Sequence, residues 1–438
     1  MENSWLSTQQ ESRPNYTNII NKPMRKILLA MLIFSFAALP AWGTYQVRGQ
    51  QQICDQPHQD VSTPLIDLGS EVYIRMDGQN TGFSGGLYPN GSNQRPASHE
   101  AAGIPIGRQI VPLDENGNPD PQNGKIVMLS IGVSNTYLEF AAFNNLVRSD
   151  PEVNPHLFLV NGAQDGQASD RWVDPAARTW QEVFLRLATY NKTPAQVQIA
   201  WIKQTRLGYG EFPDQALALQ SDLEAISRNL KTHFPNIKLA YLSSRTRSYR
   251  YWRGLSPEPT AFETGFAVKW LVEKQINGDP ELNYDPASGE VKAPYLSWGP
   301  YIWIDGLNPR SDGRTWTPED MTIDCTHPSQ AGSAKVAEML MEFFKNDTTT
   351  TPWFLAGQSP EPTPTQIFLP TVTNTRPAPT AEQSQPTPVQ AQPSPAQAQP
   401  EEPALAPTEE AVPGFSICGI GSALTALLFA GLVYRRRC

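Results

Sequence analysis

The strongest constraint on the fold is a regular alternation of two patterns between residues 125 and 344. Short apolar runs, typical of buried strands, alternate with longer segments whose apolar residues recur every three or four positions, as in amphipathic helices. Such alternation predicts a parallel sheet with helices on both of its faces. The predicted strands lie at 125–130, 156–160, 197–202 and 237–242. The predicted helices lie at 136–147, 175–190, 214–234, 259–275 and 330–344.

The regions on either side of this pattern differ from it in composition. Residues 44–124 are rich in Gly, Asn and Pro, and we interpret them as an irregular lead-in packed on a main domain at 125–356. Residues 357–413 are rich in Pro, Thr, Gln and Ala. Because this composition cannot bury enough apolar surface to offset the entropy of ordering, it predicts a disordered, extended stalk.

Both ends of the chain carry patterns that are typical of secreted, membrane-anchored proteins. Residues 1–43 combine an N-terminal extension with a signal peptide, in which basic residues precede the apolar run 27–39. Residues 414–438 contain the uncharged run 415–434, which at ~1.5 Å per residue spans about one hydrocarbon core. Three arginines follow it, which predicts a transmembrane anchor with a cytoplasmic tail and an extracellular main domain. The alternatives are an N-terminal membrane anchor and removal of the C-terminal tail by a sorting protease.

Charge and cysteine content disfavour several function classes. The 34 Lys and Arg residues against 43 Asp and Glu give a net charge of −9, which disfavours a nucleic-acid partner because phosphate binding needs a basic face. The 4 cysteines form no CxxC pair, and no cofactor motif is evident, so we expect no metal and no cofactor. An extracellular location permits a disulfide between Cys54 and Cys325, but the sequence leaves this pairing open.

Polar residues follow the predicted strands, at the edge where parallel sheets place their binding sites. The first strand is followed by Ser134, and Asp324 and His327 stand just before the last helix. Together these residue types form an acyl-transfer site, because the imidazole takes the proton of the serine and the carboxylate orients and stabilises the imidazole. Each residue alone also has an ordinary structural explanation, such as a helix cap for Ser134. The prediction therefore rests on their combination.

This combination resembles the SGNH (GDSL-like) hydrolase superfamily over residues 125–344. The first block of the family is similar to Gly-Val-Ser-Asn at 132–135, its second-block glycine falls on Gly166, and its Asp-x-x-His block matches 324–327. The resemblance implies a three-layer α/β/α flavodoxin-like fold with a parallel central sheet. It also implies hydrolysis of esters or thioesters without a metal or cofactor.

The resemblance assigns a role to each of these site residues. It implies that Ser134 is the nucleophile, that His327 is the general base and that Asp324 is the orienting partner of His327. The N–H groups of Ser134 and Gly166 would then hold the developing oxyanion.

The chain departs from the family in the third block, where Gly-x-Asn-Asp is expected and 201–204 reads Trp-Ile-Lys-Gln. The asparagine amide of the oxyanion hole is therefore missing. The alternatives are that Gln204 supplies an amide from a one-residue shift, that Lys203 supplies a charge, or that the protein is slow or inactive.

Arg245, Arg250 and Trp252 are the candidate substrate-binding residues. They belong to the segment 245–253, which holds four arginines and three aromatic residues directly after the fourth predicted strand. Aromatic faces can stack on sugar rings, and guanidinium groups pair with carboxylates or phosphates, which points to an acidic glycan. The alternative is a solvated loop that is tied down by two nearby glutamates.

The sequence therefore predicts a secreted, membrane-anchored serine ester hydrolase, acting on acyl or acetyl esters of extracellular or cell-wall carbohydrate. The alternative is a non-catalytic glycan-binding surface module on the same fold. The acyl group, the leaving group and the oligomeric state stay open.

Overall fold

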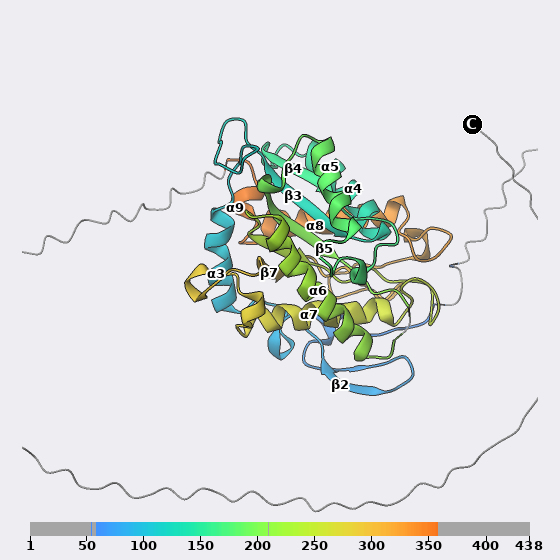
Figure 1. Cartoon of the computed structure of the whole chain (residues 1–438). Helices are drawn as coiled ribbons and strands as arrows, with labels where there is room; N and C mark the ends of the chain where they lie inside the picture. The colour runs from blue at the N-terminus through green and yellow to red at the C-terminus, as the bar shows by residue number, and fades with distance from the viewer. Residues whose placement is uncertain (1–53, 55–57, 209, 358–438) are drawn as a thin grey trace, which may run out of the picture. The chain divides into compact units, whose positions relative to one another are not determined.

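The structure is a computed structural model of the whole chain and describes residues 54, 58–208 and 210–357 (Figure 1). The predicted signal peptide, most of the stalk and the predicted transmembrane anchor lie outside these residues, so they stay predictions. Within the described residues, none of the helices combines the length and the apolar character that a membrane span needs.

A parallel sheet of five strands forms the centre of the domain, in the order β4-β3-β5-β6-β7. Numbered along the chain, this order is 2-1-3-4-5, which is that of flavodoxin-type doubly wound sheets. The strands are β3 (Ile126–Gly132), β4 (Leu157–Asn161), β5 (Val197–Lys203), β6 (Leu239–Leu242) and β7 (Tyr295–Trp298). The first four match the predicted strands. The last was not predicted.

Helices cover both faces of the sheet and complete a three-layer α/β/α arrangement (Figure 1). Along β3, Val127 and Leu129 belong to one core cluster, whereas Ile126 and Met128 belong to the other, as the alternation of side chains along a strand requires. The first cluster holds residues of α5, α6 and α7, and the second holds residues of α4 and α8. These five helices are the predicted ones: α4 (Ser134–Ser149), α5 (Arg178–Thr189), α6 (Asp214–His233), α7 (Thr260–Ile276) and α8 (Gln330–Asn346).

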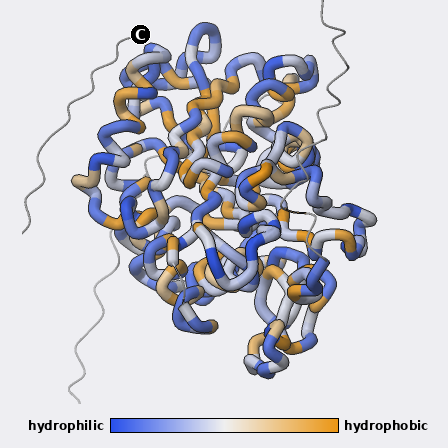
Figure 2. The backbone as a smooth tube through the Cα atoms, turned by 90° about the vertical axis from the view of Figure 1, so that its right-hand side faces the viewer, coloured by the Kyte–Doolittle hydropathy of each residue, from blue (hydrophilic) through white to orange (hydrophobic). Residues whose placement is uncertain are grey.

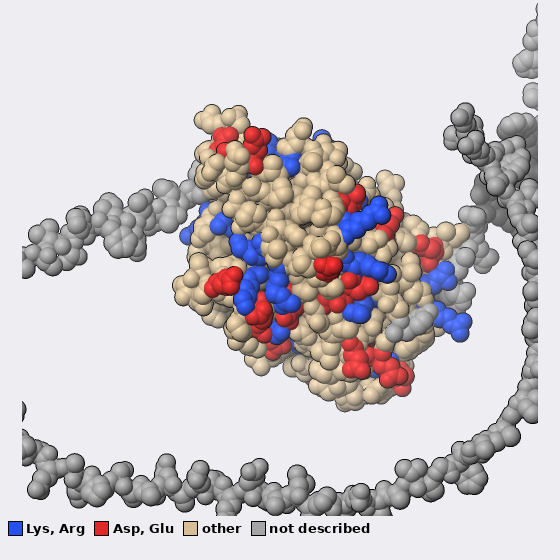
Figure 3. Space-filling view, viewed as in Figure 1, with Lys and Arg blue, Asp and Glu red and all other residues tan. Residues whose placement is uncertain are grey.

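Many segments in the interior of the domain are hydrophobic, as the orange parts of the tube in Figure 2 show. All residues of β3 and β5 are buried, which explains why the sequence shows them as continuous apolar runs. On the face seen in Figure 3, Lys and Arg side chains lie among Asp and Glu side chains.

The lead-in is more regular than predicted. It contains the hairpin strands β1 (Val72–Ile74) and β2 (Asn80–Ser84) and the helices α2 (Leu65–Leu68) and α3 (Ala97–Arg108); a further short helix, α9 (Thr351–Phe354), follows α8. The sequence does not predict α3, because the helix contains Pro105 and two glycines, which are poor helix formers. These glycines permit close packing: a Cβ atom on Gly103 would lie 2.6 Å from the ring of Tyr295, and one on Gly107 would lie 2.3 Å from the carbonyl oxygen of Thr349.

Candidate active site

Ser134 is the first residue of α4 and follows β3 after a tight turn. A Cβ atom on Gly132 would lie 2.2 Å from Thr136 Oγ1 and 2.4 Å from the carbonyl oxygen of Lys203, so only glycine fits at this position. The Thr136 hydroxyl donates a hydrogen bond of 2.7 Å to the same carbonyl oxygen. The turn is thereby tied to the end of β5, which fixes Ser134 at the carboxyl edge of the sheet.

Ser134, His327 and Asp324 form one chain of hydrogen bonds. The Oγ atom of Ser134 lies 2.7 Å from His327 Nε2, and His327 Nδ1 lies 2.5 Å from Asp324 Oδ2. When the Nδ1–H group donates to the carboxylate, Nε2 is left as the acceptor for the serine hydroxyl. This is the arrangement in which an imidazole can act as a general base.

Asp324 is held in its loop, residues 322–327, which we call the catalytic loop. Its Oδ1 atom accepts hydrogen bonds from the backbone N–H groups of Thr326 and His327, both at 2.9 Å, and from Thr322 Oγ1 at 2.7 Å. Partial burial raises the pKa of Asp324, but the hydrogen bonds from His327, Thr326 and Thr322 outweigh it and hold the pKa well below its ordinary value. The carboxylate therefore stays ionised and able to stabilise an imidazolium.

The catalytic loop is braced from two sides. Cys325 forms a disulfide with Cys54, which settles the pairing that the sequence left open and joins the lead-in to this loop. On the other side, Tyr249 N–H donates to the carbonyl oxygen of Cys325 at 3.0 Å, and Arg250 Nε donates to that of Asp324 at 2.9 Å. Cys325 itself has a φ of 60°, a conformation that non-glycine residues rarely adopt, so these contacts hold it in place.

Lys203 of the third block is paired inside the protein. Its Nζ atom hydrogen-bonds to both carboxylate oxygens of Glu139 on α4, and both side chains are fully buried. Burial lowers the pKa of Lys203 to about 8 and raises that of Glu139, although the two charges attract each other. The Lys203 charge is therefore held by Glu139 in the interior.

Gly166 and Gln204 lie close together beside the site. The loop that carries Gly166 is tied to the end of β3, because Gln164 N–H donates to the carbonyl oxygen of Gly132 at 2.9 Å. Gly166 has a φ of 67°, which favours glycine. Gln204 is buried, and its Nε2 atom lies 3.4 Å from the carbonyl oxygen of Gln167, which puts its amide beside this loop.

An open cavity of about 670 Å³ lies in front of Ser134 and His327. Its size is typical of sites for small molecules. Besides the hydrogen-bonded chain, it is lined by Tyr137, Leu138, Ala163, Asp165 and Arg186. None of these residues was predicted from the sequence. For two of them a signal exists, because Tyr137 and Leu138 follow Ser134 by three and four residues and so share its face of the helix.

The three predicted substrate-binding residues do not line this cavity. Arg245 is only 3% exposed, so it belongs to the interior and not to a substrate surface. Residues 245–249 of its segment are buried, whereas Arg250, Trp252 and Arg253 are exposed. The segment is tied to a nearby glutamate, as the alternative expects, because the backbone N–H of Ser248 donates to the buried carboxylate of Glu258 at 2.9 Å. Arg250 is exposed behind the catalytic loop, and Trp252 is 46% exposed, where the guanidinium of Arg75 lies 5.9 Å from its ring.

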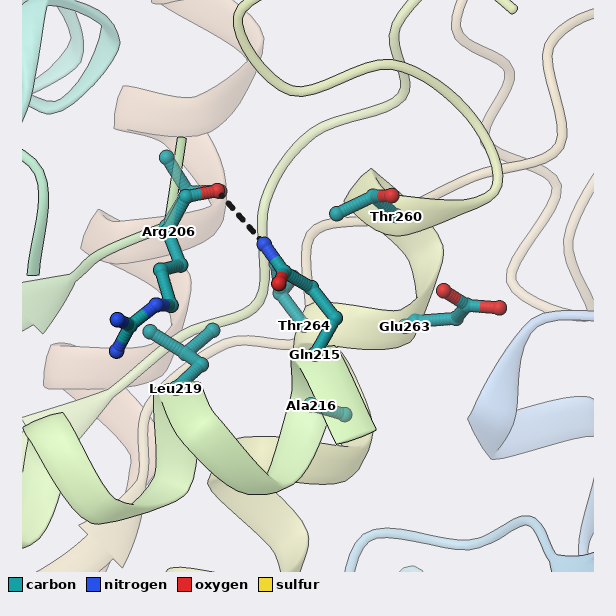
Figure 4. A pocket seen from close by; sticks show the side chains of 8 residues that line it. Arg206, Gln215, Ala216, Leu219, Thr260, Glu263 and Thr264 are labelled. Carbon is teal, nitrogen blue, oxygen red and sulfur yellow. Dashed lines mark hydrogen bonds between the residues drawn. The ribbon is translucent and has the colours of Figure 1, made fainter. Parts of the chain in front are cut away.

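Two other features do not suit a substrate or a cation. The pocket in Figure 4, lined by Arg206, Gln215 and Glu263 among others, has a volume of about 10 Å³, enough for one water molecule. His58, Asp60 and Asp305 also come within metal-binding distance of one another. Asn308 Nδ2 donates to both carboxylates, and the guanidinium of Arg247 pairs with Asp305, so these oxygens are already held by N–H donors.

No protein-family model matches the chain, and no curated protein matches its sequence. Matching solved structures include a "putative SGNH hydrolase" from Slackia heliotrinireducens, with 13% identity, 50% of this chain and 99% of that chain covered, and a TM-score of 0.27. A "putative acylhydrolase" from Bacteroides fragilis has 13% identity, coverage of 58% and 100%, and a TM-score of 0.30. The periplasmic domain of a lipopolysaccharide acetyltransferase from Salmonella Paratyphi A has 11% identity, coverage of 50% and 84%, and a TM-score of 0.28. At these TM-scores the likenesses carry no argument about this chain.

Proposed function

We propose that the chain is a serine-dependent ester hydrolase of the SGNH type, extracellular and anchored to the membrane, which cleaves acyl or acetyl esters, carbohydrate esters among them. One observation carries the proposal: the hydrogen-bonded chain from Ser134 Oγ through His327 to Asp324, which opens on a cavity of about 670 Å³. The resemblance of the sequence blocks to the SGNH superfamily supports the same chemistry.

The reaction has two halves, the formation and the hydrolysis of an acyl-serine, and both use all three side chains. His327 Nε2 takes the proton of Ser134 as Oγ bonds to the ester carbonyl carbon, and the tetrahedral intermediate then expels the alcohol, which receives that proton. In the second half, His327 Nε2 takes a proton from a water molecule as its oxygen bonds to the acyl carbon. The bond between that carbon and Ser134 Oγ then breaks, Oγ receives the proton from His327, and the carboxylic acid leaves. Asp324 stabilises the imidazolium in both halves.

The oxyanion needs donors at the carboxyl edge of the sheet. The N–H of Ser134 lies at the start of α4, where backbone donors have no partner within the helix and the helix dipole favours negative charge. The N–H of Gly166 and the amide of Gln204 are the further donors that we propose for the oxyanion.

The test is covalent labelling and turnover with the full chain. We expect a fluorophosphonate probe to label the protein, and p-nitrophenyl acetate and butyrate to be hydrolysed, with both activities lost in Ser134→Ala. Ser149→Ala, at the far end of the same helix, is the matched control and should keep both. Labelling that persists in Ser134→Ala would exclude this nucleophile. If the wild type shows neither labelling nor turnover, the non-catalytic glycan-binding alternative replaces the hydrolase.

A further inference from the structure

Two apolar side chains stay partly exposed beside Ser134. Tyr137 is 44% exposed and Leu138 is 38% exposed, and both line the cavity in front of Ser134. They lie three and four residues after Ser134, on the same face of α4. An aromatic ring in this position offers a flat apolar face next to the reacting hydroxyl.

The ring of Tyr137 is held in place by Arg186. The guanidinium carbon of Arg186 lies 5.9 Å from the centre of the ring. Arg186 is in turn fixed by the end of β4, because its Nη1 atom donates to the carbonyl oxygens of Asn161 at 2.8 Å and Ala163 at 2.7 Å. Its Nε atom donates to Glu182 at 3.0 Å. The aromatic surface is thus preorganised, which lowers the entropy lost on binding.

Asp165 lines the same cavity from another segment of the chain, and its carboxylate oxygens are hydrogen-bond acceptors. It is exposed, and among the described residues its carboxylate has no hydrogen-bond or ion-pair partner. A carboxylate can accept hydrogen bonds from two or more hydroxyl groups. The cavity therefore combines one flat apolar face with one free acceptor group.

We infer that this cavity binds a sugar ring, with the C–H face of the ring on Tyr137, its hydroxyl groups donating to Asp165, and an O-acyl group at Ser134. The inference rests on the proposed function and names its substrate class. A sugar ring suits the cavity because it has an apolar face and a polar edge. A long acyl chain suits it less, because it would take Asp165 and Arg186 out of water without giving them hydrogen bonds.

The experiment compares two esters of the same acid with the full chain. Acetylated xylotriose carries the sugar ring and ethyl acetate carries none, and released acetic acid is titrated for both. We expect Tyr137→Ala to raise the KM for acetylated xylotriose about tenfold, which is about 1.4 kcal/mol, with kcat changed less than about twofold. We expect Tyr137→Phe, which keeps the aromatic face, to retain a KM close to that of the wild type. Asp165→Asn should raise the KM roughly threefold to fivefold, since an amide oxygen is a weaker acceptor than a carboxylate.

The matched control is Tyr190→Ala. Tyr190 is also an exposed tyrosine, at 53%, but it packs on Phe158 and does not line the cavity, so its loss should leave both kinetic constants unchanged. The inference is wrong if Tyr137→Ala leaves the KM for acetylated xylotriose unchanged, or if ethyl octanoate, which has an unactivated alcohol like ethyl acetate, is cleaved with a higher kcat/KM than acetylated xylotriose.

A binding measurement separates this inference from the proposed function. Calorimetry with Ser134→Ala and unmodified xylotriose measures binding without turnover. Binding that is weakened about tenfold in Ser134→Ala/Tyr137→Ala supports the sugar site even if the wild type hydrolyses no ester. Turnover of ethyl acetate together with no measurable xylotriose binding would leave the hydrolase standing and overturn the sugar site.

Discussion

Replacing Glu139 by Gln should destabilise the fold more than replacing its partner Lys203 by Met. Both side chains of this ion pair have 0% exposure. Arg245 is also buried, and the charge of Glu139 is among the interactions that raise its pKa against the larger effect of burial. Glu139 therefore faces two buried cations. Glu139→Gln leaves Lys203 without its counter-ion and Arg245 with the charge of Glu258 alone, whereas Lys203→Met leaves Glu139 with Arg245.

The expected sizes follow from the cost of an unpaired buried charge. Breaking a buried pair by removing one partner costs about 3–5 kcal/mol, and we expect Glu139→Gln to fall in this range. At about 2 °C per kcal/mol for a domain of this size, the melting temperature should fall by roughly 6–10 °C. Lys203→Met should cost about half as much, because the remaining carboxylate keeps a cationic partner and the methionine fills the space.

The assay is thermal and urea unfolding of the full chain. Glu152→Gln is the matched control: Glu152 is 72% exposed and pairs with Lys345 at the surface, so its loss should cost less than about 1 kcal/mol. A larger loss for Lys203→Met than for Glu139→Gln would refute the reasoning, because it would mean that Arg245 does not share the charge of Glu139.

Three further predictions test the site and its surroundings. Gln204→Leu should lower kcat for p-nitrophenyl acetate about 10²–10³-fold with little change in the melting temperature, as loss of an oxyanion donor does; an unchanged kcat would exclude its amide. Cys54→Ser should destabilise the fold by about 2–5 kcal/mol in urea unfolding, and a reducing agent should then lower the stability of the wild type but not of the variant. Burial raises the pKa of Glu263 to about 7, so its stabilising contribution is present below about pH 4.5 and lost as the pH rises through 7. The melting temperature should therefore fall between pH 5 and pH 8, and less steeply in Glu263→Gln.

The parts of the fold that the sequence predicts are those whose pattern follows from burial. β3 and β5 are buried on both faces, so their residues form continuous apolar runs, and the long helices show the period of one buried face. The helix α3 was missed for a tertiary reason. Its glycines exist because Tyr295 and Thr349 lie against them, and these contacts join segments almost two hundred residues or more apart in the chain.

The site also combines residues that a local pattern predicts with residues that only tertiary contacts bring together. Ser134 was predicted because it follows the first predicted strand, at the edge where a parallel sheet places its sites, and Asp324 and His327 because of their Asp-x-x-His spacing before the last helix. The structure joins the three in one chain of hydrogen bonds. The burial of Arg245 was not predictable, because an arginine-rich segment reads as a surface until the partners of its charges are known. Asp165 and Arg186 were missed for a similar reason, since each lies in a loop or helix position that is ordinary in sequence and lines a cavity only in the folded chain.

The third block, residues 201–204, contains a residue that serves the core and a residue that lies beside the site. Trp201 and Lys203 lie two residues apart on β5, so their side chains point to the same face of the sheet, toward α4. The lysine side chain meets Glu139 of α4 there. Gln204 is the next residue, where the strand has ended, and its side chain turns toward the loop of Gly166. The Lys203 cation is paired with a buried carboxylate, so it cannot move toward a charge that develops at Ser134. The Gln204 amide has two N–H donors, and one hydrogen bond, to the carbonyl oxygen of Gln167, leaves the second donor for an oxyanion. Of the two donors that the sequence offers in place of the missing asparagine, Lys203 is already paired with Glu139 inside the fold, so the amide of Gln204 is the donor that we propose.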